Sequence, residues 1–173
     1  KLRFPKPAAC GKTPLMAQGL SKSYGSQEIF TDVDLAIDRG SRVVILGLNG
    51  AGKTTLVRGL VRALGGRGAV RSPTYSLLET YALAPWEVLH LDLYRLAGPG
   101  ELQALGLPDF DRPGALWLIE WPERLGAGPA ADLEVHLRAE PAQHRVSLRA
   151  GTPRAIEVVD RIASSYELSP TGR

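Results

Sequence analysis

The chain has 173 residues, of which 44% are hydrophobic and 23% are charged, and its formal net charge is +3. This composition is typical of one folded domain with an apolar core rather than a disordered chain. No apolar run approaches the roughly 20 residues that cross a bilayer, and no apolar signal core follows the basic start KLRFPKPAACGK, which argues against membrane insertion and export. The modest positive charge allows an RNA or phosphate partner without requiring one.

Residue usage also bears on the compartment and origin of the chain. The single cysteine, Cys10, cannot form an internal disulfide, which favours a reducing cytoplasm. Cys10 has no base beside it in the sequence, so we do not expect a catalytic thiol there. The sequence begins at Lys1 without a methionine, and we therefore expect a processed or engineered fragment.

The first elements lead up to a glycine-rich loop. Residues 1–14 are rich in proline and basic residues and predict an extended, partly mobile lead-in. The segments LMAQGLSKSY and EIFTDVDLAI alternate apolar and polar residues around a turn-like break, which predicts two antiparallel strands. RVVIL, at residues 42–46, is typical of a strand buried on both faces. Apolar residues then recur at helical spacing from Leu56 to Leu64, before two glycines that end the helix.

Further strands are expected in the second half. WEVLHLDL and ALWLIEW predict strands, and GPGELQALGL predicts a short helix between them. ADLEVHLRA and HRVSLRA predict a final hairpin. SSYELSPTGR, at residues 164–173, predicts a polar tail that frays. His136 and His144 lie in the hairpin without a metal-like cluster and are interpreted as structural or exposed.

The glycine-rich loop GLNGAGKTT matches the pattern G-x-x-x-x-G-K-[ST] between Gly47 and Thr54. Glycines let backbone N–H groups face one concavity, and the following helix presents its positive end there. Lys53 is expected to reach the β and γ phosphates, and the Thr54 hydroxyl to bind Mg²⁺. A glycine-rich strand-to-helix turn is the alternative. The predicted nucleotide-binding residues of the loop are Asn49, Gly50, Ala51, Gly52, Lys53, Thr54 and Thr55.

Upstream of the loop, the sequence LSKSYGSQEIFTDVDLAIDRGSRVVILGLNGAGKTTL resembles the start of an ABC ATPase of the ABC-F type. In that family an aromatic residue of the first strand region stacks on adenine, and Tyr24 occupies the matching place; a half-buried strand tyrosine is the alternative. No LSGGQ-like signature, glutamine loop or apolar run ending in Asp-Glu follows Lys53. We therefore do not expect the chain to run the ABC cycle.

Downstream, the chain resembles TsaE, the small bacterial ATPase needed for the threonylcarbamoyl modification of tRNA. The resemblance is carried by GAGKTTLVRGLVRALGG, SPTYSLLETY, HLDLYRL, ELQALGL and IEWPERLG, in that order. It implies ATP and Mg²⁺ as cofactors, slow ATP hydrolysis, and a threonylcarbamoyl-transferase complex and tRNA as partners. The typical TsaE start and GDLGAGKT loop are replaced by ABC-like sequence and GLNGAGKT, which predicts a chimera joined near the loop.

The resemblance also implies roles for residues outside the loop. Thr74, in SPTYS, takes the place of a switch residue near Mg²⁺ or the γ-phosphate; an ordinary Ser-Pro turn is the alternative. Asp92 and Glu120 end two strands, where an open α/β sheet places its ligand groups. Glu120 is expected nearer the metal and Asp92 nearer the switch and the attacking water, although the roles could be reversed.

Residues beside these carboxylates have alternative interpretations. His90 and Arg95 flank Asp92 within HxDxYR; Arg95 either touches phosphate or, in the favoured interpretation, pairs with a carboxylate. Tyr75 could pack over the nucleotide. Trp121 lines the site or a partner surface, or belongs to the core.

Together these patterns predict one three-layer P-loop α/β domain over residues 1–173, with a mainly parallel sheet and antiparallel hairpins at both ends. An ABC-like part is expected over residues 15–56 and a TsaE-like part over residues 47–150. The favoured function is Mg²⁺-dependent binding and slow hydrolysis of ATP in a TsaE-like site. ATP is preferred over GTP because neither NKxD nor another guanine-reading motif is present. The alternatives are a chimera that binds nucleotide without turnover or docking, and an ABC-F-like ATPase fragment. Because the typical TsaE start is replaced, we expect this chain to retain ATP binding and to show weakened or lost activation by the transferase complex.

Overall fold

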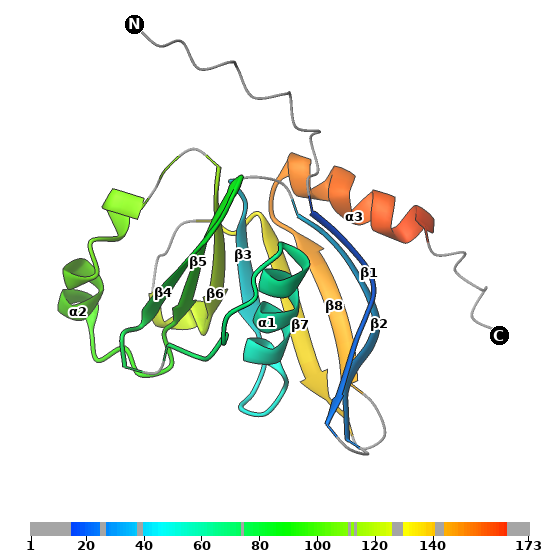
Figure 1. Cartoon of the computed structure of the whole chain (residues 1–173), viewed down its shortest axis with the longest axis horizontal. Helices are drawn as coiled ribbons and strands as arrows, with labels where there is room; N and C mark the ends of the chain where they lie inside the picture. The colour runs from blue at the N-terminus through cyan, green and yellow to red at the C-terminus, as the bar shows by residue number, and fades with distance from the viewer. Residues whose placement is uncertain are drawn as a thin grey trace, which may run out of the picture.

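The computed structural model describes residues 15–24, 27–37, 40–73, 75–110, 112, 114–125, 130–140 and 144–165. Its elements, shown in Figure 1, are β1 (Leu15–Tyr24), β2 (Gln27–Ile37), β3 (Arg42–Leu46), α1 (Lys53–Ala63), β4 (Leu78–Leu83), β5 (Trp86–Asp92), α2 (Pro99–Ala104), β6 (Ala115–Glu120), β7 (Leu133–Ala139), β8 (His144–Ala150) and α3 (Pro153–Ser165). Two short 3₁₀ helices are η1 (Leu107–Phe110) and η2 (Pro122–Leu125). No helix in these ranges is long and apolar enough to cross a membrane.

A six-stranded sheet with the order β4-β5-β6-β3-β7-β8 forms the centre of the fold. The inner pairs β5–β6, β6–β3 and β3–β7 are parallel, whereas the outer strands β4 and β8 pair antiparallel with β5 and β7. The expected mainly parallel sheet is therefore confirmed, and the expected C-terminal hairpin, β7–β8, belongs to it. The expected N-terminal hairpin is also present, as the separate antiparallel pair β1–β2.

Helical layers cover both faces of the sheet and give the expected three-layer α/β fold. On one face, Leu56 and Leu60 of α1 pack with Ile45 of β3 and Leu116 of β6 in one buried cluster. On the other face, a second cluster is bordered by apolar side chains of α2, η1 and η2, among them Phe110. Every residue of β6 is buried, as the unbroken apolar run of a central parallel strand requires.

Helix α1 begins directly after the glycine-rich loop and ends where the sequence predicted. Its apolar positions Leu56, Val57, Leu60 and Val61 are buried against the sheet. Gly65 then adopts a φ of 94°, a left-handed conformation that glycine tolerates at the end of a helix. The loop is therefore held between a buried strand and a buried helix.

Strand β4 and helix α3 were not predicted, and neither were the two short 3₁₀ helices. Strand β4 lies at the sheet edge, and none of its residues is buried, so its sequence carries little core signal. Helix α3 contacts β2 and β8. Its first turn is capped by Thr152, whose Oγ1 accepts a hydrogen bond from the backbone N–H of Ala155 at 3.3 Å. The expected frayed tail was wrong at residues 164 and 165, which are helical because α3 extends to Ser165; residues 166–173 and the lead-in 1–14 lie outside the described residues.

Candidate functional site

The loop between β3 and α1 has a backbone that requires glycine. Gly47 has a φ of 155°, and a Cβ atom there would lie 2.6 Å from the carbonyl oxygen of Leu137. Gly50 and Gly52 have φ values of 80° and 95°. The first turn of α1 contains no acidic residue, so the positive end of the helix dipole stays available to an anion.

The side chain of Lys53 lies folded within the loop and is 6% exposed. Its Nζ donates hydrogen bonds to the carbonyl oxygens of Gly47, at 2.7 Å, and Leu48, at 3.0 Å. The same Nζ lies 4.1 Å from the centre of the Trp121 ring. Burial lowers the pKa of Lys53, and the negative charge of Glu120 is the largest influence in the opposite direction. The loop therefore holds a cation where the motif predicts the β and γ phosphates.

Glu120 joins the first turn of α1 to the end of β6. The Thr54 hydroxyl donates to the carboxylate, with Oγ1 at 3.0 Å from Oε1 and 3.3 Å from Oε2. On its other side, Oε1 lies 2.9 Å from Nε2 of His90. Glu120 is only 2% exposed. The sequence predicted Thr54 and Glu120 as site residues, and the structure brings them into direct contact.

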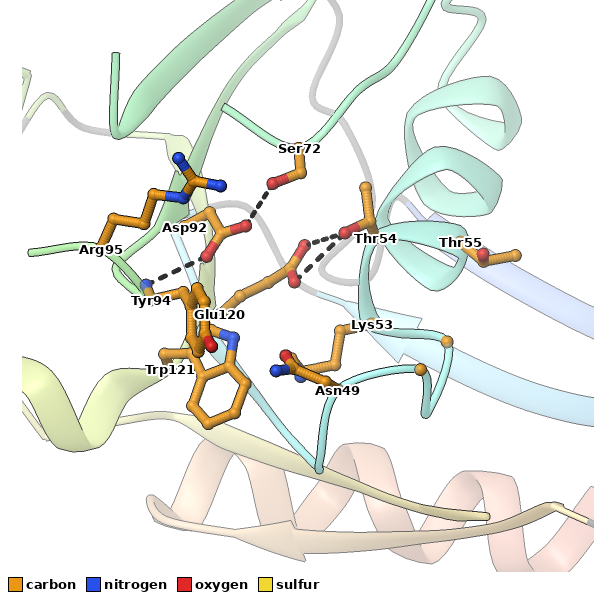
Figure 2. A pocket seen from close by; sticks show the side chains of 12 residues that line it. Asn49, Lys53, Thr54, Thr55, Ser72, Asp92, Tyr94, Arg95, Glu120 and Trp121 are labelled. Carbon is orange, nitrogen blue, oxygen red and sulfur yellow. Dashed lines mark hydrogen bonds between the residues drawn. The ribbon is translucent and has the colours of Figure 1, made fainter. Parts of the chain in front are cut away.

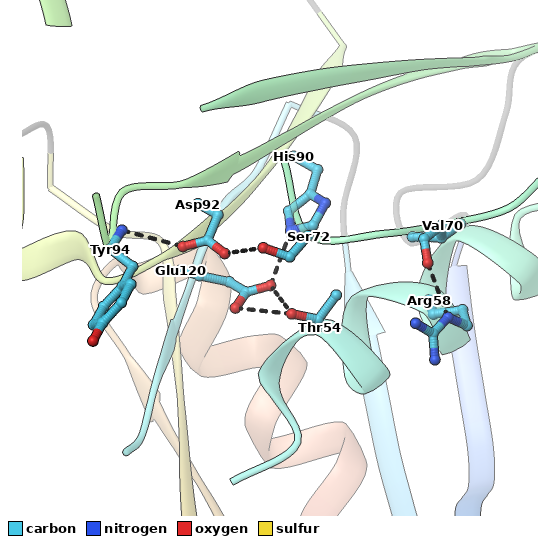
Figure 3. Close-up of polar contacts among 8 residues, drawn as sticks. All are labelled: Thr54, Arg58, Val70, Ser72, His90, Asp92, Tyr94 and Glu120. Atoms are coloured by element: carbon cyan, nitrogen blue, oxygen red, sulfur yellow. Dashed lines mark hydrogen bonds and ion pairs between the residues drawn. The ribbon is translucent and has the colours of Figure 1, made fainter. Parts of the chain in front are cut away.

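Asp92 ends β5 next to Glu120, because these two residues are register partners across the parallel pair β5–β6. Ser72 donates a hydrogen bond from its hydroxyl to Oδ2 of Asp92, and the backbone N–H of Tyr94 donates to Oδ1 at 3.1 Å. Asp92 is therefore tied to the SPTYS segment, while Glu120 is tied to the P-loop helix (Figure 3). This division agrees with the expected difference between the two carboxylates, although their chemical roles remain predictions.

These groups face one cavity of about 340 Å³ (Figure 2). Its lining residues are Asn49, Gly50, Gly52, Lys53, Thr54, Thr55, Ser72, Asp92, Tyr94, Arg95, Glu120 and Trp121. Ala51, within the loop, is buried at 2% exposure and is not among the residues that line the cavity. Thr74 lies outside the described residues, and Tyr24 is described only as the end of β1, so their expected contacts with nucleotide stay predictions.

Ser72 and Tyr94 were not proposed as site residues from the sequence. Their signal is positional, because Ser72 opens SPTYS and Tyr94 lies between Asp92 and Arg95. Tyr94 packs against Trp121 with ring centres 5.0 Å apart. Trp121 lines the cavity and also packs against the apolar cluster on the α2 side of the sheet, so it belongs to both the site and the edge of the core.

Arg95 also lines the cavity, but within the described part of the chain it contacts an aromatic ring. Its guanidinium carbon lies 5.4 Å from the centre of the ring of Tyr75, whereas the sequence interpretation favoured a carboxylate partner. Tyr75 is 91% exposed. His136 contacts Glu134 at 3.0 Å on β7, and the side chain of His144 is outside the described part of the chain.

The oxygen groups of the cavity fit a magnesium ion. A hydroxyl and two carboxylates converge there, and Mg²⁺ prefers oxygen ligands, few of them from protein. Among the described residues, no group of three His, Cys, Asp or Glu side chains forms a complete metal site. A bound ion would therefore take its remaining ligands from phosphate and water, as is usual at nucleotide sites.

The glycine loop after a buried parallel strand, the helix behind it and the two strand-end carboxylates define the P-loop NTPase fold. The family model for the threonylcarbamoyl adenosine biosynthesis protein TsaE matches residues 11–147, and the chain belongs to this family. The match begins well before the loop and includes residues 15–46, for which the sequence resembled an ABC ATPase.

Curated relatives that are named TsaE agree with this assignment. The tRNA threonylcarbamoyladenosine biosynthesis protein TsaE of Haemophilus influenzae is 43% identical over 104 residues, covering 60% of this chain and 66% of the relative. The Synechocystis TsaE is 39% identical over 95 residues, covering 53% and 60%. A probable ABC transporter ATP-binding protein of Azorhizobium caulinodans is 33% identical over 166 residues, covering 90% and 56%. The chain thus spans less than two thirds of the length of each of these relatives.

A solved structure shows the same fold. The crystal structure of YdiB from Bacillus subtilis superposes with a TM-score of 0.58 at 23% sequence identity, covering 73% of this chain and 79% of that protein.

Proposed function

We propose that this protein binds ATP with Mg²⁺ and hydrolyses it slowly, in the service of tRNA threonylcarbamoyladenosine formation. The observation that carries the proposal is the contact of the Thr54 hydroxyl with Glu120, formed at the mouth of a glycine loop that also holds Lys53. A phosphate-binding loop, a hydroxyl and a strand-end carboxylate within one cavity are the parts that Mg²⁺-dependent nucleotide chemistry needs.

Each group has a definite task in this proposal. The backbone N–H groups of residues 50–55 and the positive end of α1 hold the phosphates, and Lys53 exchanges its carbonyl partners for phosphate oxygens. Thr54 and Glu120 hold Mg²⁺, which supplies charge neutralisation at the β and γ phosphates. Asp92, fixed through both of its oxygens, orients the attacking water and accepts its proton.

The choice of ATP rests on the family and on the lack of a guanine-reading motif in the sequence. Tyr24 remains our candidate for stacking on adenine, and Thr74 our candidate for the switch residue that approaches the γ-phosphate. The partners proposed here are tRNA, which the names of the TsaE relatives include, and a threonylcarbamoyl-transferase complex, which the sequence resemblance implies.

A second candidate is a chimera that binds nucleotide but neither turns it over nor docks. The similarity to an ABC ATP-binding protein is a weak hint of it and does not favour it over the TsaE function. That similarity extends over 166 residues and marks no junction at the loop, while the TsaE match begins at residue 11. We therefore prefer the TsaE function. The ABC-F-like fragment is weaker still, because the chain has no ABC signature sequence.

Calorimetry and turnover assays test the proposal together. ATP titrated with Mg²⁺ is expected to bind more tightly than ATP in EDTA, and GTP to bind more weakly than ATP. Turnover is then measured alone and with the transferase complex and tRNA. Stimulation supports the TsaE function, whereas binding without turnover under either condition selects the chimera. If the protein binds and hydrolyses ATP but the transferase complex does not stimulate turnover, the defect lies in docking. Docking needs a contact surface of roughly 800 Å² on each partner.

A further inference from the structure

His90 is a fully buried histidine that the proposed function does not use. It lies in β5 at 0% exposure, and its Nε2 is 2.9 Å from Oε1 of Glu120 (Figure 3). Side chains alternate along a strand, so His90 shares the α1 face of the sheet with Val88, which belongs to the α1-side cluster, and with Asp92. Burying a polar imidazole costs free energy that an apolar side chain would not, unless the ring forms a hydrogen bond, here with the carboxylate beside it.

The hydrogen-bond partners define the form of the ring. A carboxylate accepts hydrogen bonds, so the proton between the two side chains belongs to Nε2 of His90. In the described part of the chain, the buried Nδ1 has no hydrogen-bond partner. His90 therefore acts on Glu120 as a hydrogen-bond donor through Nε2.

The Nε2 donor of His90 and the Thr54 hydroxyl contact the same carboxylate oxygen of Glu120. Oε1 of Glu120 receives Nε2 of His90 at 2.9 Å and the Thr54 hydroxyl at 3.0 Å, one from β5 and one from α1. A glutamate side chain has several rotatable bonds, and holding it in one conformation costs entropy. Because His90 restrains Oε1, the carboxylate is already oriented toward Thr54 before any ion arrives.

We infer that His90 is a positioning residue for Glu120, which it holds in the conformation that, together with Thr54, receives Mg²⁺ at the nucleotide site. The inference rests on the proposed function, since it assigns the metal to Glu120 and Thr54. His90 lies under the cavity without solvent exposure, so it acts through Glu120 rather than on the nucleotide. Partners that orient a metal-binding carboxylate commonly influence metal affinity about 10- to 100-fold.

Two substitutions separate the hydrogen bond from the bulk of the ring. His90→Gln keeps an N–H donor close to the place of Nε2, whereas His90→Leu keeps the volume and removes the donor. We expect His90→Leu to raise the Mg²⁺ concentration for half-maximal ATP binding about 10- to 100-fold, and His90→Gln to recover most of that loss. Binding of ATP in EDTA, which depends on the loop and Lys53, is expected to be unchanged in both variants.

The matched control is His136→Gln. His136 contacts a glutamate at a similar distance, 3.0 Å, but on β7, and its side chain is 43% exposed. The His136→Gln protein should need the same Mg²⁺ concentration for half-maximal ATP binding as the wild type. A His90→Leu protein with wild-type Mg²⁺ dependence would overturn the inference while leaving the proposed function intact. If ATP binding by the wild type does not depend on Mg²⁺, the proposed function fails and the inference fails with it.

A measurement on the wild type decides the matter if both His90 variants unfold. Nitrogen-15 NMR of the imidazole identifies the protonated nitrogen. The proton is expected on Nε2, and its resonance is expected to shift when Mg²⁺ is added to the ATP-bound protein. A proton found on Nδ1, or a resonance indifferent to Mg²⁺, would contradict the positioning role.

Discussion

Thr54 and Glu120 connect the first turn of α1 to the carboxyl end of β6, through contacts of 3.0 Å and 3.3 Å from one hydroxyl to both carboxylate oxygens. The two residues are far apart in the chain and meet because β6 pairs directly with β3, the strand that leads into the loop. A parallel sheet places the ends of neighbouring strands together, so the loop and the carboxylate reach the cavity from adjacent strands.

Substitution of the two carboxylates should produce different defects. Glu120→Ala removes the partner of Thr54 and is expected to weaken Mg²⁺-dependent ATP binding. Asp92→Ala leaves that contact intact and is expected to lower turnover, since Asp92 is tied to Ser72 and Tyr94 instead. Each effect could reach about a hundredfold, the scale of a positioned catalytic group. Calorimetry and single-turnover assays separate them. The reverse pattern would exchange the roles, and wild-type behaviour of both variants would reject the site.

Lys53 is expected to control nucleotide affinity and its dependence on pH. Lys53→Ala and Lys53→Met should both lower ATP affinity sharply, because the cation between the phosphates is lost. The methionine variant retains most of the buried side-chain volume, so folding should survive in at least that protein. Calorimetry with a folded variant that binds ATP as tightly as the wild type would refute the phosphate-binding interpretation of the loop.

The affinity for ATP should decrease as the pH rises. Burial lowers the pKa of Lys53 below its ordinary value of 10.5, and only the protonated side chain attracts phosphate. ATP affinity should therefore be greatest below the lowered pKa and should fall as the pH rises through it, before an ordinary lysine titrates. Binding isotherms at increasing pH measure this fall. Lys53→Met should show no corresponding decrease over the same range.

Gly47 is expected to matter for stability as well as for binding. A Cβ at Gly47 would lie 2.6 Å from the carbonyl oxygen of Leu137, whereas a Cβ at Gly50 would have no atom within 4 Å. Both residues have positive φ, so each alanine variant bears a backbone cost of about 1–3 kcal/mol. Gly47→Ala should lose more free energy of unfolding than Gly50→Ala, because it also displaces β7. Urea unfolding of the nucleotide-free proteins makes the comparison, and equal losses would show that β7 yields without cost.

The sequence supported the fold best where local signals were strong. The loop motif, the apolar run of β3 and the helical spacing of α1 agree with one another, so this unit could be predicted with its boundaries. Strand β4 was not predicted because an edge strand with no buried residue has little apolar periodicity. Helix α3 was not predicted although Thr152 before Pro153 is a helix-start signal. This helix depends on packing against β2 and β8, which the local sequence does not show.

The site was predictable only in part, for a similar reason. Motif spacing identified Lys53 and Thr54, and strand ends identified Asp92 and Glu120. The contact of His90 with Glu120 depends on the neighbouring strand and on the face of the sheet, which local sequence does not specify. The packing of Trp121 against Lys53 likewise arises only when the end of β6 meets the loop.

Ser72 should link the SPTYS segment to catalysis through Asp92. Its hydroxyl donates to Oδ2 of Asp92, while Oδ1 is held by the backbone N–H of Tyr94. Removing the hydroxyl in Ser72→Ala frees one oxygen and lets the carboxylate rotate away from the water it orients. Turnover should fall about tenfold, less than the hundredfold expected for loss of a positioned base, and ATP affinity should be unchanged because Lys53, Thr54 and Glu120 are untouched.

Ser76→Ala, in the same segment, provides the matched control, since Ser76 is exposed and does not line the cavity. The two variants are compared by single-turnover hydrolysis at saturating ATP and Mg²⁺. Equal rates would show that Asp92 keeps its position without Ser72 and that the segment contributes through another residue.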